Sequence, residues 1–347
     1  MNDRSPSSVT RHVQDAPTVP PWLTIHQMVT GYQVSQAMYV ASKLDLHPIL
    51  AAGPKTSDEM AATVGAHPRT LYRLLRALAS AGMFSEREDG RFESTALSAE
   101  LWRAKLLFVG EESYRAWGDL HASVMTGEPA FGRVFGTTFF GYLQQNPEAA
   151  TFWGDWNART ALERLPAAVA EYDFTRFGTL VDVGGGQGTF ISTILQANPT
   201  LRGILFDLPD VVGAAPAVLE AAGVADRCRV VGGDFFQKLP AGGDAYILSR
   251  VLLNWDDAEA TRILVNCRRA MGERGTLVVV DLIMPPPDHP ARRVRAFNDL
   301  NLMLMFGALT RTEAEWRRLF AAAGFGFAVL TPNPTDLAVM EGAPTPA

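Results

Sequence analysis

The sequence of 347 residues predicts an α/β fold in two parts, a mostly helical N-terminal part and a C-terminal part built on a parallel sheet. From Trp22 to about Ala170, apolar residues recur at intervals of three and four, as they do on one face of a helix. From Phe174 onwards, short apolar runs alternate with helical segments, a pattern typical of parallel sheets.

A winged helix-turn-helix is predicted in the N-terminal part. Residues 55–84 (KTSDEMAATVGAHPRTLYRLLRALASAGMF) favour two helices, the first capped by Ser57 or Asp58 and ended by Gly65, the second opened by Pro68. Residues 85–95 (SEREDGRFEST) then predict two short strands around an Asp89-Gly90 turn.

Such a unit often binds DNA, but its charge argues against this role here. From Lys55 to Arg103 the sequence contains seven basic and seven acidic residues, so this stretch has no net positive charge. The attraction to phosphates that drives DNA affinity is therefore missing. The net charge of −6 for the whole chain gives no footprint for nucleic acid or an anionic membrane either. We therefore expect a structural or dimerisation role.

The remaining bulk features point to a cytoplasmic protein. Residues 1–21 are polar and rich in proline, which predicts a flexible tail and no signal peptide. No run reaches the roughly 18 apolar residues of a membrane helix. Cys228 and Cys267 form no ligand-spaced pair, so we expect no metal site built on cysteines.

The C-terminal part predicts five strands, a helix near Glu313–Ala323 and two last strands. The five strands are expected in TLVDVG, GILFDLP, RCRVVGGD, DAYILS and GTLVVVD, and the last two in FAVL and DLAVME. The predicted organisation is therefore a tail over 1–21, a winged-helix domain over 22–104, a helical connector over 105–174, and a sheet domain over 175–347.

The glycine-rich stretch 181–190 (VDVGGGQGTF) ends an apolar strand and opens a helix. Thr189 stands where a dinucleotide-binding loop needs its third glycine, and the lysine of a phosphate-binding loop is absent. Glycines let a ligand approach the backbone closely, and the upstream Asp182 favours a cation. A plain tight turn is the alternative.

Two more carboxylates end the next strands of the predicted sheet. Asp207 ends the second strand, where it can accept hydrogen bonds from both ribose hydroxyls, and Asp234 ends the third, beside Phe235. Each alone could cap a helix. Three carboxylates at successive strand ends favour a nucleoside site.

On these residues the sequence resembles the class I S-adenosylmethionine-dependent methyltransferases, and more narrowly the small-molecule O-methyltransferases. The likeness runs from about Trp22 to Met340, through VDVGGGQG, FDLP, GGDFF, SRVLLNWDD, LVVVDLIMPP and NDLNLMLMFGALTRTEAEW. It is nearest to bacterial anthracycline-tailoring and phenazine methyltransferases. The resemblance implies a Rossmann-like domain, a homodimer formed by the winged-helix domain, and a metal-independent reaction. It implies S-adenosylmethionine binding by Asp182, Gly184, Gly186, Asp207, Leu208, Gly233, Asp234, Phe235, Ser249, Arg250 and Trp255.

The general base of plant-type relatives is replaced in this chain. Their histidine stands just before the Asp-Trp pair, at the position of Leu253. Two acids that flank this base in the family match Asp281 and Thr310. We expect Asn254 to orient the acceptor, Asp281 to remain at the catalytic position, and no residue to act as an obligatory base.

The acceptor pocket is expected on two segments. In 294–307 (VRAFNDLNLMLMFG), helical spacing places apolar residues and two asparagines on one face, and in 152–159 (FWGDWNAR) tryptophans accompany an amide. Both could equally be core packing. The resemblance favours acceptor binding by Phe152, Trp153, Trp156, Asn157, Phe297, Asn298, Asn301 and Met305.

The sequence is best interpreted as a methyltransferase of secondary metabolism, such as antibiotic biosynthesis, acting on a hydroxyl of a phenolic or polycyclic aromatic acceptor. The alternatives are an N-methyltransferase of a phenazine-like heteroaromatic, a hydroxylase that binds the cofactor without methylating, and a winged-helix regulator that senses the cofactor.

Overall fold

The computed structural model describes residues 20–100, 103–329 and 337–346. By its internal contacts the chain divides into two compact units, residues 1–110 and 111–347. Most of the predicted N-terminal tail lies outside the described residues. No helix of the described ranges is long and apolar enough to cross a membrane.

The first unit contains the predicted winged helix. Helix α3 (Ser57–Val64) ends at Gly65, which has a left-handed φ of 69°, and α4 (Pro68–Ser80) leads into the antiparallel hairpin of β1 (Phe84–Glu86) and β2 (Phe92–Ser94). The predicted cap at Ser57 or Asp58 is wrong. Thr56 caps α3, because its hydroxyl accepts from the Glu59 amide while the Glu59 carboxylate accepts from the Thr56 amide.

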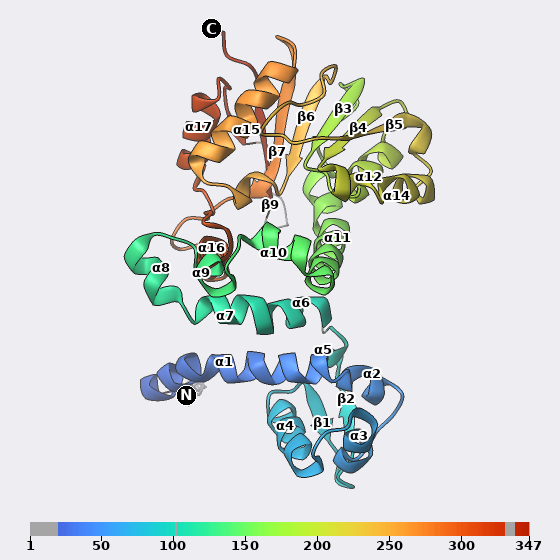
Figure 1. Cartoon of the computed structure of the whole chain (residues 1–347), viewed down its shortest axis with the longest axis vertical. Helices are drawn as coiled ribbons and strands as arrows, with labels where there is room; N and C mark the ends of the chain where they lie inside the picture. Colours follow the sequence, from blue (N-terminus) through green and yellow to red (C-terminus); the bar gives the residue numbers. More distant parts are fainter. Residues whose placement is uncertain (1–19, 101–102, 330–336, 347) are drawn as a thin grey trace, which may run out of the picture. The chain divides into compact units, whose positions relative to one another are not determined.

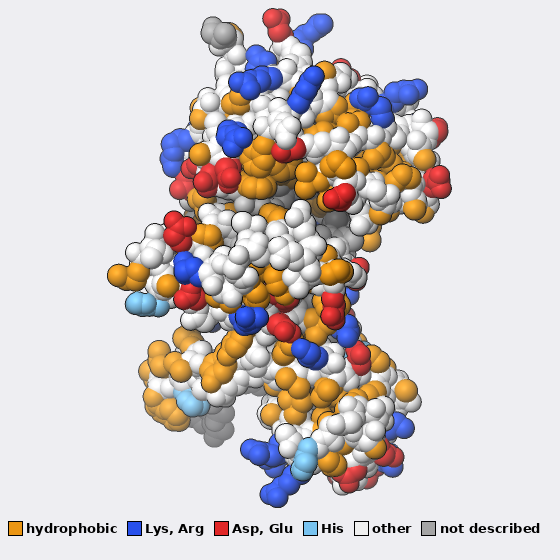
Figure 2. Space-filling model, in the orientation of Figure 1, with side chains coloured by type: hydrophobic (Ala, Val, Ile, Leu, Met, Phe, Trp, Pro, Cys, Tyr) orange, Lys and Arg blue, Asp and Glu red, His pale blue; other side chains and the backbone are white. Residues whose placement is uncertain are grey.

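Four further helices complete the first unit, and a π-helix, η1 (Val109–Ser113), spans its boundary with the second. The helices are α1 (Pro21–Lys43), α2 (Leu46–Ala51), α5 (Ala96–Ala99) and α6 (Arg103–Phe108). Helix α1 leaves a stripe of large apolar side chains exposed. Figure 2 shows apolar side chains on the N-terminal half of this helix, and the stripe consists of Trp22, Ile25, Met28, Val29 and Tyr32.

The second unit is built on a seven-stranded sheet in the order β5-β4-β3-β6-β7-β9-β8 (Figure 1). Strands β3 to β7 are parallel, and β9 pairs antiparallel with β7 and β8. Their bounds are β3 (Thr179–Val183), β4 (Arg202–Asp207), β5 (Cys228–Gly232), β6 (Ala245–Ser249), β7 (Thr276–Leu282), β8 (Ala328–Val329) and β9 (Leu337–Gly342). The predicted parallel sheet is therefore confirmed, with an antiparallel edge.

Apolar cores cover both faces of this sheet, which explains why its strands read as nearly continuous apolar runs. One core joins Leu180 and Leu205 to α12, and the other joins Val181 and Leu248 to α15 and α17. The helices of the second unit are α7 (Tyr114–Trp117), α8 (Leu120–Thr126), α9 (Ala130–Phe135), α10 (Phe139–Gln145), α11 (Pro147–Val169), α12 (Thr189–Ala197), α13 (Pro209–Val212), α14 (Ala215–Ala221), α15 (Asp257–Ala270), α16 (Arg292–Phe306) and α17 (Glu313–Ala322), with 3-10 turns η2 (Ala225–Arg227) and η3 (Leu252–Asn254).

The strand order also predicts where a ligand binds. The chain runs outward from β3 to β4 and β5 on one side, and returns to β6 and β7 on the other. In open parallel sheets, ligands lie at the carboxyl ends of the strands where the order reverses, here between β3 and β6.

Candidate cofactor and acceptor site

The glycine loop follows β3 and leads into α12. Gly186 lies in the left-handed region with a φ of 63°, and a Cβ atom at this position would have no heavy atom within 4 Å. Its amide donates a hydrogen bond of 2.8 Å to Oδ2 of Asp207. The loop is thus held against β4 and keeps open space above its backbone, as a ligand platform requires.

Asp182 lies beneath this loop as an uncompensated carboxylate. Its side chain is 1% exposed, and neither oxygen accepts a hydrogen bond from the described residues. A Cβ atom on Gly185 would lie 2.4 Å from Oδ2, so only glycine fits over the carboxylate. Burial, reinforced by the charge of Asp207, raises the pKa of the Asp182 carboxyl to about 7. A ligand with a positive charge would stabilise its ionised form.

Asp207 joins the ends of β3, β4 and β5. Its carboxylate accepts the amides of Gly186 and Leu208 at 2.8 and 2.7 Å, and its carbonyl accepts the amide of Gly233 at 2.9 Å. Each carboxylate oxygen keeps a second acceptor position. Burial raises the pKa of this carboxyl, while the two backbone hydrogen bonds lower it. Leu208, next in the chain, is 45% exposed.

An aromatic group stands at the end of β5. Asp234 turns the chain by accepting the amide of Phe236 at 2.8 Å. The rings of Phe235 and Phe236 lie edge-on to Trp255, with centroids 5.8 and 4.8 Å away. The structure therefore brings together Asp234, Phe235 and Trp255, which the sequence predicted at the adenine.

The end of β6 carries two unusual residues. The Ser249 hydroxyl is buried and has no hydrogen-bond partner among the described residues. Arg250 has a φ of 56°, a backbone conformation that residues other than glycine rarely adopt. Its amide donates to the Val280 carbonyl at 2.9 Å, and its guanidinium donates to Oδ1 of Asn157 at 3.4 Å. Strained residues of this kind cluster at functional sites.

The turn η3 contains Leu253, the position that the sequence resemblance assigns to the family's base. Leu253 is 7% exposed, and its amide donates to Asp281 at 3.2 Å. Asp281 is fully buried and also accepts the amide of Leu282 at 2.8 Å. Each of its carboxylate oxygens therefore accepts one backbone amide. Burial raises its pKa to about 6, against the lowering effects of these hydrogen bonds and of Arg311 and Arg250. The side-chain Nδ2 of Asn254 donates to the Arg250 carbonyl at 3.4 Å.

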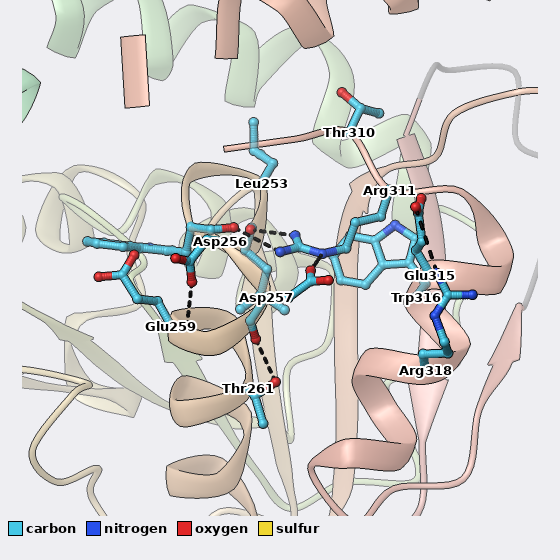
Figure 3. A network of polar contacts seen from close by, with 12 residues as sticks. Leu253, Asp256, Asp257, Glu259, Thr261, Thr310, Arg311, Glu315, Trp316 and Arg318 are labelled. Atoms are coloured by element: carbon cyan, nitrogen blue, oxygen red, sulfur yellow. Dashed lines mark hydrogen bonds and ion pairs between the residues drawn. The ribbon is translucent and has the colours of Figure 1, made fainter. Parts of the chain in front are cut away.

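Arg311 fixes this turn from the other side, a contact that the sequence analysis missed. The guanidinium is fully buried and donates to the carbonyls of Leu252 and Trp255 at 2.9 and 2.8 Å, and to Asp257 at 2.7 Å (Figure 3). It also stacks over Trp316. Nothing in the spacing of TRTEAEW predicts that this arginine is buried.

Further aromatic residues link the turn to the predicted acceptor segments. Phe140 stacks on Trp255 at 6.1 Å and on Phe306 at 5.9 Å, and Phe306 also lies 6.1 Å from Trp153. Trp153 in turn meets Trp156 edge-on at 5.3 Å. Phe139, Phe140 and Phe306 were not predicted from the sequence, because single aromatic residues at the ends of helices carry no distinct signal.

The other predicted acceptor residues occupy mixed positions. Phe297 is 56% exposed whereas Met305 is buried, and Phe152 and Asn298 are half-buried. Asn157 donates to the Trp153 carbonyl at 3.0 Å. Asn301 accepts hydrogen bonds from Ser113 at 2.8 Å and from the Trp117 indole at 3.0 Å. The helix α16 that carries Asn301 packs against η3.

Histidines are rare in the second unit. Its two histidines, His121 and His289, are both exposed. The described residues contain no cluster of three or more histidine, cysteine or acidic residues that could hold a metal ion.

Comparisons with known proteins match both units. An O-methyltransferase domain model matches residues 117–326, and an O-methyltransferase dimerisation domain model matches residues 26–103. The chain is 44% identical to phenazine O-methyltransferase PhzM of Lysobacter antibioticus, over 92% of this chain and 95% of that protein. It is 31% identical to the phenazine-1-carboxylate N-methyltransferase of Pseudomonas aeruginosa, over 91% of this chain and 96% of that protein.

Several similar solved structures contain ligands, among them one with S-adenosylmethionine and an aromatic acid. It is the O-methyltransferase NcsB1 from neocarzinostatin biosynthesis, in complex with S-adenosylmethionine and 2-hydroxy-5-methyl naphthoic acid. It superposes with a TM-score of 0.80 and 31% identity, covering 89% of this chain and 95% of that chain.

Proposed function

The chain belongs to the family of S-adenosylmethionine-dependent O-methyltransferases that carry a dimerisation domain, and from this premise we propose that it methylates a hydroxyl group of a phenolic or polycyclic aromatic secondary metabolite. The observation that carries the proposal is the buried carboxylate of Asp182, which has no hydrogen-bond partner among the described residues and lies under an open glycine loop. It fits a positively charged nucleoside.

The residues at the strand ends fit S-adenosylmethionine in charge and in shape. When bound, this cofactor supplies an electrophilic methyl group on a positively charged sulfur. Asp182 would offset the positive charge of the methionine part, and the open backbone at Gly186 would let it approach. Asp207 would accept hydrogen bonds from the ribose, while Phe235 and Trp255 would flank the adenine.

On the acceptor side, the chain's residues would position a nucleophile and exclude water. The aromatic group of Phe140, Trp153 and Phe306 suits a flat ring system. The contacts of Arg311 and Asp281 hold the backbone around Leu253 and Asn254, so the position of this turn is fixed. Proximity and orientation together contribute about 7 to 11 kcal/mol in favourable cases.

The reaction proceeds without a histidine base in this proposal. Leu253 occupies the base position, and Asp281 holds backbone amides with both oxygens. A phenol of pKa near 10 costs roughly 4 kcal/mol to ionise at pH 7. Proximity offsets this cost, and an acceptor with an electron-withdrawing substituent lowers it further.

N-methylation is the second candidate. An aromatic ring nitrogen has a free lone pair and no proton to lose, so it needs no base at Leu253. The similarity to a phenazine-1-carboxylate N-methyltransferase favours this alternative.

A homodimer is the proposed assembly. The match to a dimerisation domain supports it, and so does the exposed apolar stripe on α1. A second copy of the chain would remove this stripe from water, as apolar patches of this kind require.

A panel of aromatic acceptors tests the proposed function. The purified protein is incubated with S-adenosylmethionine and with matched phenols and ring-nitrogen heterocycles, and S-adenosylhomocysteine release is measured. Mass spectrometry then identifies the methylated atom. Release with phenols supports O-methylation, and release only with ring nitrogens supports the second candidate. Tight binding of S-adenosylmethionine without release for any acceptor would contradict both.

A further inference from the structure

The amide side chain of Asn301 is held in one orientation. It lies on α16 in the second unit, and its Oδ1 accepts hydrogen bonds from the Ser113 hydroxyl at 2.8 Å and from the Trp117 indole nitrogen at 3.0 Å. An indole N–H can only donate. The atom that faces it must therefore be the oxygen of Asn301, which places the nitrogen on the other side.

These two contacts leave Asn301 able only to donate. A carboxamide oxygen has two lone pairs, and both are used here by the protein. The Nδ2 group has two N–H donors and makes no hydrogen bond to the described residues. The Nδ2 atom is not buried, so it remains accessible.

Asn301 lies among the groups that would surround an aromatic acceptor. Its helix packs against η3, and Phe306 at the end of the same helix joins the aromatic group around Phe140 and Trp153. Ser113 is buried and Trp117 is half-buried. A donor that is oriented so firmly, on the same helix as Phe306, selects for a ligand atom that accepts a hydrogen bond.

We propose that Asn301 is a specificity-determining donor, and that the acceptor carries a carbonyl or carboxylate oxygen conjugated with the hydroxyl that is methylated. This inference rests on the proposed function and names the substrate class. A ligand group that can only donate, such as an ammonium group, would find no acceptor at this residue.

Such an acceptor would also ionise more easily, which reduces the need for a general base. Conjugation with a carbonyl group spreads the negative charge of the phenolate, and donation from Asn301 Nδ2 to that carbonyl stabilises it further. The phenol proton passes to water. The phenolate oxygen then forms a bond to the methyl carbon while the carbon–sulfur bond breaks, and its electron pair remains on sulfur.

The variant Asn301→Asp separates this role from a structural one. Both protein hydrogen bonds of Asn301 go to oxygen, so an aspartate retains them, loses the two N–H donors and adds one negative charge. We expect its thermal unfolding midpoint to stay within about 2 °C of wild type. The matched control is Ser113→Ala, which removes one hydrogen bond inside the protein and keeps the donor.

Two naphthols of similar acidity serve as acceptors, one with an acetyl group para to the hydroxyl and one acidified by two chlorine atoms. Wild type should prefer the acetyl compound. Asn301→Asp should lower kcat/KM for the acetyl compound roughly tenfold to hundredfold and change it less than about threefold for the dichloro compound. Ser113→Ala should lower both values by the same factor.

Three outcomes contradict the inference and remain distinguishable. An equal loss for both naphthols in Asn301→Asp, or no loss, overturns the donor role while methylation itself stands. A wild-type preference for the dichloro compound overturns the substrate class without any variant. If wild type releases S-adenosylhomocysteine with no aromatic acceptor, the proposed function fails and the inference fails with it.

Discussion

The guanidinium of Arg311 donates a 2.9 Å hydrogen bond to the carbonyl of Leu252, the first residue of the turn that carries Leu253. From the other side, Asp281 accepts the amide of Leu253 at 3.2 Å. Two buried side chains of opposite charge thus hold one short turn through its backbone. The Leu253 side chain has no polar group, so these contacts hold the turn through its backbone.

Replacing Arg311 should therefore be far more damaging than replacing its ionic partner. Arg311→Met would leave two buried carbonyls without donors, and we expect it to lower the free energy of unfolding by about 3 kcal/mol or more. The control is Asp257→Asn. The Asp257 side chain is 67% exposed, so the loss there should stay below about 1 kcal/mol. Urea unfolding followed by fluorescence measures both, and equal losses would refute the assignment.

The proposed reaction without a histidine base predicts a simple pH dependence. For wild type, kcat/KM with a series of phenols should rise with the ionisation of each phenol, and the midpoint should shift with the pKa of the acceptor. Leu253→His should add a group with a pKa near 6.5 and raise the rate most for the least acidic phenols. Stopped assays from pH 6 to 9 test this. A fixed midpoint near 6 to 7 in wild type, whatever the phenol, would reveal a base.

Much of this fold could be predicted because its signals are local. The alternation of apolar runs and helices predicted the parallel strands, and Gly65 and Pro68 mark the ends of helices by backbone preference alone. Thr56 was missed as a cap since three neighbouring residues, Thr56, Ser57 and Asp58, can all cap a helix. The choice depends on which hydroxyl reaches the Glu59 amide.

The site could be predicted only where its residues follow strands directly. Asp182, Asp207 and Asp234 end successive strands, so the strand order brings them to one edge of the sheet. Arg311, Ser113 and Trp117 act across distances of 59, 188 and 184 residues in sequence. Such contacts depend on how helices pack, and a single sequence carries no signal for them.

The exposed stripe of α1 predicts how the dimer would be broken. Val29, with an exposed fraction of 68%, and Ile25, with 60%, lie on one face of the helix. The double change Ile25→Asp and Val29→Asp places charges in a surface that a second copy would bury, so the protein should become a monomer. Gln27 lies on the opposite face, and Gln27→Asp is the control. Light scattering coupled to size exclusion measures the mass, and a double variant that remains dimeric would place the interface elsewhere.

Asp182 predicts a linked effect of pH on stability and on cofactor binding. Its pKa is raised from the ordinary 3.8 to about 7, so between these values the native state holds a proton that the unfolded state has released. The free energy of unfolding of the unliganded protein should therefore fall as pH rises through this window and stay low above it. The unliganded native state favours the protonated form of Asp182, whereas a bound cation favours its ionised form.

Asp182→Asn removes the titrating carboxyl group. It therefore tests the effect on stability without ligand and the effect on cofactor binding. Without ligand at pH 8, the variant should unfold at a higher temperature than wild type, since no buried charge remains. It should also bind S-adenosylmethionine roughly tenfold more weakly or worse, because the attraction to the positive charge is lost. Isothermal titration at pH 6 in two buffers of different ionisation enthalpy measures proton release, which wild type should show and the variant should lack. Equal proton release from both proteins would mean that another group titrates, and unchanged affinity would show that Asp182 does not sense the cofactor's charge.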